Sequence, residues 1–379
     1  MSENPLMRLH AAGQSVWQDY IDRAMLDDGS LDRLIAEDAL MGMTSNPTIF
    51  EKALSSRHDY DAPIAEAASE RTAWELFELI ETDDVRAACD KFASAYKQTR
   101  GTDGFVSIEV SPGVANDSND TIAEAHRLWA TVDRPNLMVK VPGTAEGAKA
   151  VRRLIADGIN VNITLLFAVA AHDRVIESYL SGLEERLTLG KPIDHVASVA
   201  SFFVSRVDTE TDKRLDALVA VGGNKAQLEA LKGKAAIANA KLAYRLFQQR
   251  FAGSRWEALA ARGAQLQRPL WASTSTKNPA YRDVLYVEEL IGPHTVNTMT
   301  PATIDAFRDH GVVERTVDRD VAEAERQLAA LEAVGISIAA VTEKLLVDGI
   351  ASFQKSFDTL IAGLERKTHE LGLELLPSR

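Results

Sequence analysis

The sequence predicts a (β/α)₈ barrel, a single α/β fold in which eight parallel strands alternate with helices. Short apolar segments recur along the 379-residue chain, and most are followed by a polar or Gly/Pro turn and then by a longer helical pattern. Strands that alternate with helices form right-handed βαβ units in a parallel sheet. Eight such units suggest a closed barrel, a fold that commonly runs to about 250 residues or more as one domain.

Eight segments are expected to form the strands, of which the last is weak. In chain order they are 14–21 (QSVWQDYI), 41–46 (MGMTSN), 104–110 (GFVSIEV), 136–141 (NLMVKV), 158–167 (GINVNITLLF), 195–204 (HVASVASFFV), 268–274 (RPLWAST) and 293–299 (PHTVNTM). The fourth is apolar on both faces apart from Lys140, as expected for a strand of a parallel sheet covered by helices.

The helices are expected between and after these strands. The clearest helical patterns, with apolar residues at three- and four-residue intervals, lie at 119–130, 145–156 and 168–187. Two longer intervals, about 51–103 and 205–267, break the rhythm but also have helical sequences, and a helical tail follows from about 318 to 379. Because neither interval carries a Pro/Gly/Ser-rich linker, we expect one barrel domain over 1–379, decorated by extra helices.

Composition limits the partners of the protein. The formal net charge of −13 argues against a nucleic-acid surface, which needs a basic stripe, so an anionic ligand must be small and held by a few local cations. No run of roughly 18 apolar residues is present, so we expect no membrane span. The lone Cys89 allows no internal disulfide, and the N-terminus does not resemble a signal peptide. These features favour the cytoplasm.

Motifs for metals and nucleotide cofactors are missing from the sequence. The eight histidines are scattered without ligand spacing, and there is no cysteine cluster. The patterns GxGxxG, GxxxxGK[ST] and GxSxG are also absent. We therefore expect no metal, no cofactor and no serine nucleophile.

Polar side chains recur where the predicted strands end, which is where barrels of this kind carry their chemistry. They are Asp19, Glu109, Lys140, Asn162, Thr164, Ser201 and Arg206, with the segments 44–46 and 273–277. Each has a structural interpretation: Lys140 can extend to water, Asp19 can cap a helix, and Glu109 can form an ion pair with Lys140. Burying so many polar groups together is costly, however, unless a ligand uses them.

Schiff-base catalysis is the chemistry that requires this set. Burial beside other cations disfavours a protonated lysine and makes a free amine available. Such an amine attacks a ketone carbonyl, and the resulting iminium allows the adjacent carbon–carbon bond to break. A carboxylate then takes the proton of the departing hydroxyl. Asp19 and Glu109 lie in different settings, which allows two proton-transfer roles.

The segments that carry these residues resemble the transaldolase family from about Gln14 to about Gly311. The matching pieces are SVWQDYI, GMTSNPTIF, VSIEVSPGVAND, NLMVKVPGT, GINVNITLLF, VASFFVSRVD and WASTSTKNP. The resemblance implies transfer of a dihydroxyacetone unit between phosphorylated sugars in the non-oxidative pentose phosphate pathway. The donor would be sedoheptulose 7-phosphate or fructose 6-phosphate, and the acceptor glyceraldehyde 3-phosphate or erythrose 4-phosphate.

The resemblance also implies roles for individual residues. Lys140 would be the Schiff-base lysine, Asp19 the acid/base, and Glu109 with Thr164 the holders of a catalytic water. The remaining matching residues would contact the substrate: Asn46 and Asn162 at the dihydroxyacetone unit, Ser201 in the same pocket, and Arg206, Ser275 and Lys277 at the phosphate.

Two positions bear on the subfamily. Shorter transaldolases have Arg in a Ser-Phe-Arg-Asn run where this chain has Lys277, which can hold phosphate only as a point charge. Related fructose 6-phosphate aldolases have tyrosine at Phe203, and phenylalanine has no hydroxyl to deliver a proton, so transfer is favoured over release.

The length and helical additions suit the longer bacterial-type subfamily. A fructose 6-phosphate aldolase and a non-catalytic sugar-phosphate-binding barrel remain alternatives, and a homodimer is one option for the oligomeric state.

Overall fold

The strands form a closed parallel barrel in the computed structural model, which describes residues 4–45, 47–56 and 58–377. They follow chain order around the barrel, and the last pairs with the first. Their bounds are β1 (Gln14–Asp19), β2 (Leu40–Thr44), β3 (Phe105–Glu109), β4 (Leu137–Pro142), β5 (Val161–Leu166), β6 (Ser198–Phe203), β7 (Arg268–Ala272) and β8 (Thr295–Met299). Each predicted strand segment corresponds to one of them, so the predicted (β/α)₈ barrel is confirmed.

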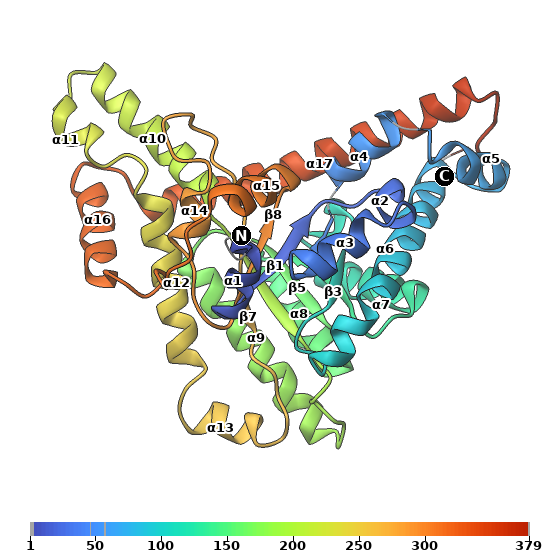
Figure 1. Cartoon of the computed structure of the whole chain (residues 1–379), viewed down its shortest axis with the longest axis horizontal. Helices are drawn as coiled ribbons and strands as arrows, with labels where there is room; N and C mark the ends of the chain where they lie inside the picture. The colour runs from blue at the N-terminus through green and yellow to red at the C-terminus, as the bar shows by residue number, and fades with distance from the viewer. Residues whose placement is uncertain (1–3, 46, 57, 378–379) are drawn as a thin grey trace.

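Helices surround this barrel (Figure 1). The first half of the chain supplies α1 (Pro5–Ala11), α2 (Arg23–Asp27), α3 (Ser30–Glu37), α4 (Pro47–Ser56), α5 (Asp61–Ala67), η1 (Ala68–Glu70), α6 (Ala73–Gln98), η2 (Pro112–Val114), α7 (Ser118–Val132), α8 (Ala145–Asp157) and α9 (Val169–Thr188). The second half supplies α10 (Ser205–Ala220), α11 (Lys225–Glu229), α12 (Ala235–Arg250), α13 (Ser254–Ala260), α14 (Leu285–Glu288), α15 (Pro301–His310), α16 (Val321–Ala333) and α17 (Ile338–Glu370). The three clearest helical patterns of the sequence correspond to α7, α8 and α9. None of the helices in the described part of the chain is long and apolar enough to cross a membrane.

The lower and middle parts of the barrel interior are packed. Trp17 of β1 and Phe105 of β3 lie on either side of Gly42 of β2 in the strand register. A Cβ at Gly42 would come within 2.6 Å of the Trp17 ring and 2.7 Å of the Phe105 carbonyl. Glycine is therefore needed here because the indole occupies the space that a side chain would fill.

Because side chains alternate along each strand, the same strand contributes to both ends of the barrel. Side chains two residues apart on a strand share a face, so β3 places Phe105 and Glu109 on one face and β4 does the same with Met138 and Lys140. All four are buried. The polar member of each pair lies at the carboxyl end of its strand and the apolar member near the amino end. The sequence thus builds two chemically different ends from the same two strands.

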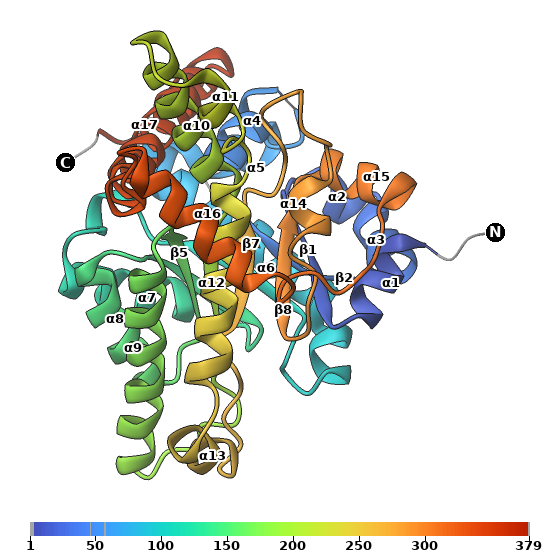
Figure 2. The ribbon, with the colours of Figure 1, turned by 90° about the vertical axis from the view of Figure 1, so that its left-hand side faces the viewer.

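Helix α17 crosses the carboxyl end of the barrel. It runs beside α4 along the upper side of the molecule (Figures 1 and 2). Its Phe357 ring lies 4.9 Å from Trp74 and 5.9 Å from Phe77 of α6, measured between ring centroids. A Cβ at Gly349 would come within 3.0 Å of Leu165 on β5. The helix is therefore held directly against the barrel rather than on its periphery.

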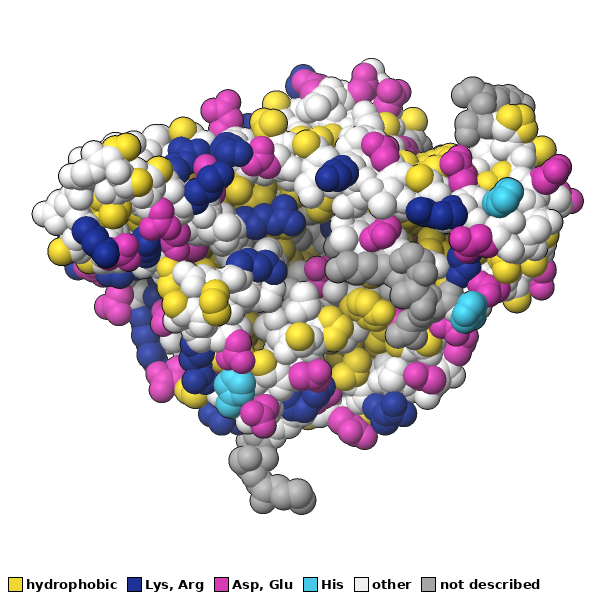
Figure 3. Space-filling model, turned by 90° about the horizontal axis from the view of Figure 1, so that it is seen from above, with side chains coloured by type: hydrophobic (Ala, Val, Ile, Leu, Met, Phe, Trp, Pro, Cys, Tyr) yellow, Lys and Arg dark blue, Asp and Glu magenta, His cyan; other side chains and the backbone are white. Residues whose placement is uncertain are grey.

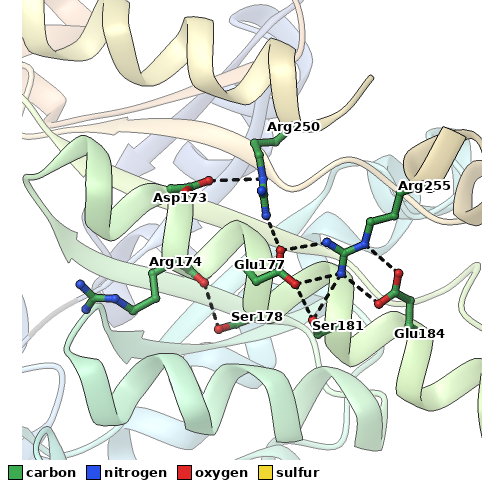
Figure 4. Close-up of polar contacts among 8 residues, drawn as sticks. All are labelled: Asp173, Arg174, Glu177, Ser178, Ser181, Glu184, Arg250 and Arg255. Atoms are coloured by element: carbon green, nitrogen blue, oxygen red, sulfur yellow. Dashed lines mark hydrogen bonds and ion pairs between the residues drawn. The ribbon is translucent and has the colours of Figure 1, made fainter. Parts of the chain in front are cut away.

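Helix α9 is joined at its outer surface to α12 and α13 by ion pairs (Figure 4). Arg255 donates to both Glu177 and Glu184, at 2.7 to 2.9 Å, and Arg250 also pairs with Glu177. Hydrogen bonds from Arg255 and neighbouring donors lower the pKa of Glu177 to about 2. This carboxylate therefore stays ionised, and the network stays intact, through the whole physiological pH range.

Candidate active site

A cavity of about 390 Å³ opens at the carboxyl ends of the strands. Seen from above, the molecule has a hollow with Lys and Arg side chains beside it (Figure 3). Strand residues lining the cavity include Asp19, Thr44, Lys140, Thr164, Ser201, Phe203 and Thr298. Residues from loops and helices include Thr48, Arg206, Ser273, Ser275, Lys277, Thr300, Ser352 and Phe353. The location is the one at which barrel enzymes carry their active sites.

Lys140 lies at the base of this cavity, paired with Glu109. The register of β3 and β4 places the two residues side by side. The ammonium Nζ of Lys140 donates to Glu109 Oε2 at 2.9 Å and to the Ser45 carbonyl at 2.9 Å. Burial raises the pKa of Glu109, although the charge of Lys140 opposes the rise. A carboxylate with a raised pKa is a good acceptor for the lysine proton, and that transfer leaves a neutral amine.

Asp19 is the second carboxyl group of the cavity. Its Oδ1 accepts a hydrogen bond from Thr44 Oγ1 at 2.7 Å, and Thr44 is bonded in turn to Thr298. Burial raises the pKa of Asp19, opposed first by the charge of Lys140 and then by Thr44, Arg206 and Lys277. The carboxyl group can therefore take up and release a proton closer to neutral pH than an exposed aspartate.

Asn162 and Ser201 form a hydrogen-bonded pair beside the lysine. Asn162 pairs with Lys140 in the β4–β5 register. Its amide Nδ2 donates to Ser107 Oγ at 3.0 Å, and its Oδ1 accepts from Ser201 Oγ at 2.6 Å. Thr164 lines the cavity, and its buried hydroxyl has no hydrogen-bond partner among the described residues. That hydroxyl is available to a bound molecule.

Two further cations line the cavity above Lys140. The Arg206 guanidinium lies 5.2 Å from the centre of the Phe203 ring, and burial lowers its pKa, opposed by the charge of Asp19. Lys277 donates to Ser275 Oγ at 2.9 Å. A site with this concentration of positive charge in a chain of net charge −13 suits a small dianion such as a phosphate ester.

Metal ligands are not gathered here. In residues 4–45, 47–56 and 58–377 no three His, Cys, Asp or Glu side chains are placed to hold a metal ion. His172 is fully buried against Phe202, and burial lowers its pKa to about 4. It is therefore a neutral ring in the core.

The structure brings most of the predicted site residues together. Eight line the cavity: Asp19, Lys140, Thr164, Ser201, Phe203, Arg206, Ser275 and Lys277. Glu109 and Asn162 do not line the cavity themselves, but each is hydrogen-bonded to a residue that does, Glu109 to Lys140 and Asn162 to Ser201. Asn46 lies outside the described residues. The catalytic and binding roles implied for these residues stay predictions.

Sequence reasoning missed several parts of the cavity, among them Thr298 and Thr300 at the end of β8. Ser352 and Phe353 of α17 contribute to its wall, although the tail was expected only to add helices. The hydrogen bond between Thr44 and Asp19 was also unforeseen. The helical periodicity of the tail indicates that one face is buried, but it does not tell which surface that face covers.

The chain is similar to one family over nearly its whole length. The family described as Transaldolase/Fructose-6-phosphate aldolase matches residues 16–364. A transaldolase of Trichodesmium erythraeum is 46% identical over 377 residues, which cover 98% of this chain and 99% of that protein. A transaldolase of Mycobacterium leprae is 47% identical over 363 residues, covering 95% and 96%. A protein named Transaldolase 2 from a Nostoc species is 46% identical over 374 residues, covering 97% and 98%.

Proposed function

This chain belongs to the transaldolase/fructose-6-phosphate aldolase family, and we propose that it is a transaldolase, a transferase that uses a Schiff base to move a dihydroxyacetone unit between phosphorylated sugars. The donor is sedoheptulose 7-phosphate or fructose 6-phosphate, and the acceptor is glyceraldehyde 3-phosphate or erythrose 4-phosphate, as in the non-oxidative pentose phosphate pathway. The observation that carries the proposal is the buried pair of Lys140 and Glu109 at the base of a cavity lined by Asp19.

The first half of the reaction forms the Schiff base. Glu109 accepts the proton of Lys140, and the neutral amine attacks the ketone carbonyl of the donor to give a carbinolamine. Loss of water gives the iminium. The unpaired Thr164 hydroxyl and the free Glu109 Oε1, both buried, can hold that water.

The second half breaks and remakes a carbon–carbon bond. Asp19 takes the proton of the hydroxyl next to the bond, the bond electrons move into the iminium, and an aldehyde leaves. The enamine then attacks the acceptor aldehyde, Asp19 returns its proton, and water releases the product from Lys140. The raised pKa of Asp19 supports a role that needs both protonation states.

Two parts of the cavity would bind two parts of the substrate. Asn162, Ser201 and Asn46 would hold the dihydroxyacetone unit near the lysine, which the proximity of Asn162 and Ser201 to Lys140 supports. Arg206, Ser275 and Lys277 would hold the phosphate at the mouth. Because Lys277 is bonded to Ser275, the two would act together.

Phe203 favours transfer over release of dihydroxyacetone. Its ring lies 5.2 Å from the Phe167 ring and 5.2 Å from the Arg206 guanidinium, and Phe203 itself brings no hydroxyl to this part of the wall. Without a hydroxyl there, the enamine is not readily protonated before an acceptor arrives. The rival function, fructose 6-phosphate aldolase, predicts free dihydroxyacetone from fructose 6-phosphate alone. An assay without acceptor should detect little of it, whereas Phe203→Tyr should increase it several-fold.

Borohydride trapping tests the proposed nucleophile. Reduction in the presence of fructose 6-phosphate should add a three-carbon adduct to Lys140, detected by mass spectrometry of peptides. Lys149 is the matched control, an exposed lysine that pairs with Glu146 on α8. Lys140→Ala should abolish transfer with a chelator present, and Lys149→Ala should not. An adduct on Lys149, or full turnover by Lys140→Ala, would refute the mechanism, and no turnover by the unmodified protein would favour a non-catalytic binding barrel.

The cytoplasm is the proposed location. The single cysteine, Cys89, is buried, so the fold uses no disulfide between its own residues and suits a reducing compartment. The acidic net charge supports small anionic sugars rather than nucleic acid as partners. A homodimer is an untested option, which sedimentation measurements would decide.

A further inference from the structure

A second cavity, of about 420 Å³, lies at the amino end of the barrel, opposite the candidate active site. Its walls come from the first residues of β3, β4, β6 and β7 and from the loops that precede β3, β6, β7 and β8. We call it the amino-end cavity. It is as large as the candidate active site and falls within the range of pockets that enclose small ligands. Nothing in the proposed transferase reaction uses it.

The inner wall of the amino-end cavity is apolar. Phe105, Met138 and Val199 project from three strands and are each 1% exposed, and Leu266 contributes from the loop before β7. Phe105 and Met138 are the apolar members of the strand pairs described above. Such a wall favours a flat or branched hydrocarbon body over a sugar, whose hydroxyl groups would find few partners there.

Nitrogen donors meet at the rim of the same cavity. The Arg100 guanidinium is exposed and makes no hydrogen bond or ion pair with the described residues. Arg268 uses Nη1 for Ser15 and Asp103, while its Nη2 is buried without a partner in the described chain. The His294 ring also lines the cavity, and burial and the charge of Arg268 lower its pKa, so it is neutral.

The nearby carboxylates leave Arg100 without a contact. Asp103 accepts from Trp17 Nε1 at 2.9 Å and pairs with Arg268 at 3.3 Å. Asp194, at the rim, is exposed and lies 3.3 Å from the His195 ring. Among the described residues, Arg100 is therefore the arginine at this cavity that contacts no carboxylate, and with Asp194 at the same rim its partner should carry a single negative charge rather than two.

We propose that the amino-end cavity is a binding site for a small aromatic or branched monocarboxylate. Its hydrocarbon body packs on Phe105, Met138 and Val199, and its carboxylate faces Arg100 and Arg268. Because the two cavities share no lining residue, this ligand and the sugar phosphate occupy separate places. The site would bind without competing with substrate.

Calorimetric titration with 2-naphthoate tests the proposal on the full chain. One molecule should bind per chain, and its uncharged analogue 2-naphthamide should bind at least tenfold more weakly. Arg100→Glu should weaken 2-naphthoate at least tenfold. The matched control is Arg262→Glu, because Arg262 is an exposed arginine outside the cavity lining whose side chain makes no hydrogen bond or ion pair with the described residues. That control should bind normally.

Two further measurements keep the result decisive. Ala264→Trp, at the edge of the cavity, should block 2-naphthoate while leaving transferase activity unchanged. Saturating fructose 6-phosphate should leave the affinity for 2-naphthoate unchanged. The proposal is overturned by absence of binding at millimolar ligand, by equal losses in the Arg100 and Arg262 variants, or by competition with fructose 6-phosphate.

Discussion

Burial is the largest cause that raises the pKa of several carboxyl groups, among them those of Asp19, Glu81, Glu109 and Asp208. Asp19 and Glu109 line or adjoin the candidate active site, and the charge of Glu109 contributes to the raised pKa of Glu81. Asp208 is different, because it lies on α10 and accepts hydrogen bonds from Tyr286 and the backbone of Ala236, both at 2.8 Å. We propose that Asp19 and Glu109 serve the chemistry of the cavity, whereas Asp208 is not among its lining residues and bears on stability.

Asp208→Asn should make stability less dependent on pH. Burial raises the pKa of Asp208 from 3.8 to about 7. The protonated form therefore contributes to the free energy of unfolding. This contribution is fully present below pH 3.8, falls by about 1 kcal/mol per pH unit as the pH rises towards 7, and is lost above pH 7. The uncharged amide can still accept from the backbone of Ala236 through its oxygen, and its nitrogen can donate to the Tyr286 hydroxyl, which then acts as the acceptor. In urea denaturation the gain of the variant over the natural protein should grow from pH 4.5 to 7 and then level off.

The exposed Asp27 supplies the control for that experiment, since Asp27→Asn changes charge at the surface without changing a buried group. Parallel stability curves for the natural protein and Asp208→Asn would contradict the interpretation.

Asp19→Asn should remove the acidic limb of the activity profile. Because the pKa of Asp19 is raised, kcat/KM of the natural protein should rise with pH through a value above that of an ordinary aspartate. An amide cannot accept the proton, so we expect kcat/KM to fall by about 10² to 10⁴. The nearby exposed Asp27→Asn should behave normally. Retention of the limb in Asp19→Asn would assign it to another group.

At the scale of elements, close packing inside the barrel determines which side chains its strands can carry. Gly42 allows Trp17 to fill the interior, and Gly42→Ala would place a methyl group 2.6 Å from that ring. Overpacking of this kind costs about 1 to 3 kcal/mol. Gly363→Ala is the matched control, because its Cβ would meet no atom within 4 Å on helix α17. That change should raise the unfolding free energy by up to about 1 kcal/mol. In urea denaturation the two variants should therefore change the unfolding free energy in opposite directions.

Helix α17 should matter for substrate binding through its attachment to α6. Phe357→Ala removes the ring that contacts Trp74 and Phe77, so the segment carrying Ser352 and Phe353 should be held less firmly. We expect a several-fold rise in KM and a loss of about 2 kcal/mol in unfolding free energy. Val347→Ala, which alters a side chain on the same helix that is 62% exposed, should change neither. A normal KM in Phe357→Ala would show that the wall does not depend on this contact.

At the scale of the whole molecule, local patterns predicted the barrel but not every contact. Strands and helices leave periodic signals in neighbouring residues, so all eight strands could be located. The pairing of Lys140 with Glu109 was foreseeable because adjacent parallel strands bring their carboxyl ends together. The contribution of Phe353 was not, since it depends on where a helix more than 300 residues from β1 packs. Strand periodicity likewise does not encode the hydrogen bond from Thr44 to Asp19.

The overall charge predicts a salt dependence. The chain carries −13, yet Lys140, Arg206 and Lys277 line one cavity. Attraction of a phosphorylated donor by these cations is screened by salt, so kcat/KM should fall several-fold between low ionic strength and about 0.5 M NaCl. Lys277→Gln should weaken that dependence, and Lys149→Gln should not. Equal salt dependence in both variants would place the phosphate elsewhere.

The wall contributed by α17 has a consequence for biosynthesis. The pocket takes Asp19 from the beginning of the sequence and Phe353 from near its end. Translation must therefore pass residue 353 before this part of the wall can form over Lys140. A product that terminates before α17 would leave the proposed nucleophile more open to water and to unrelated aldehydes.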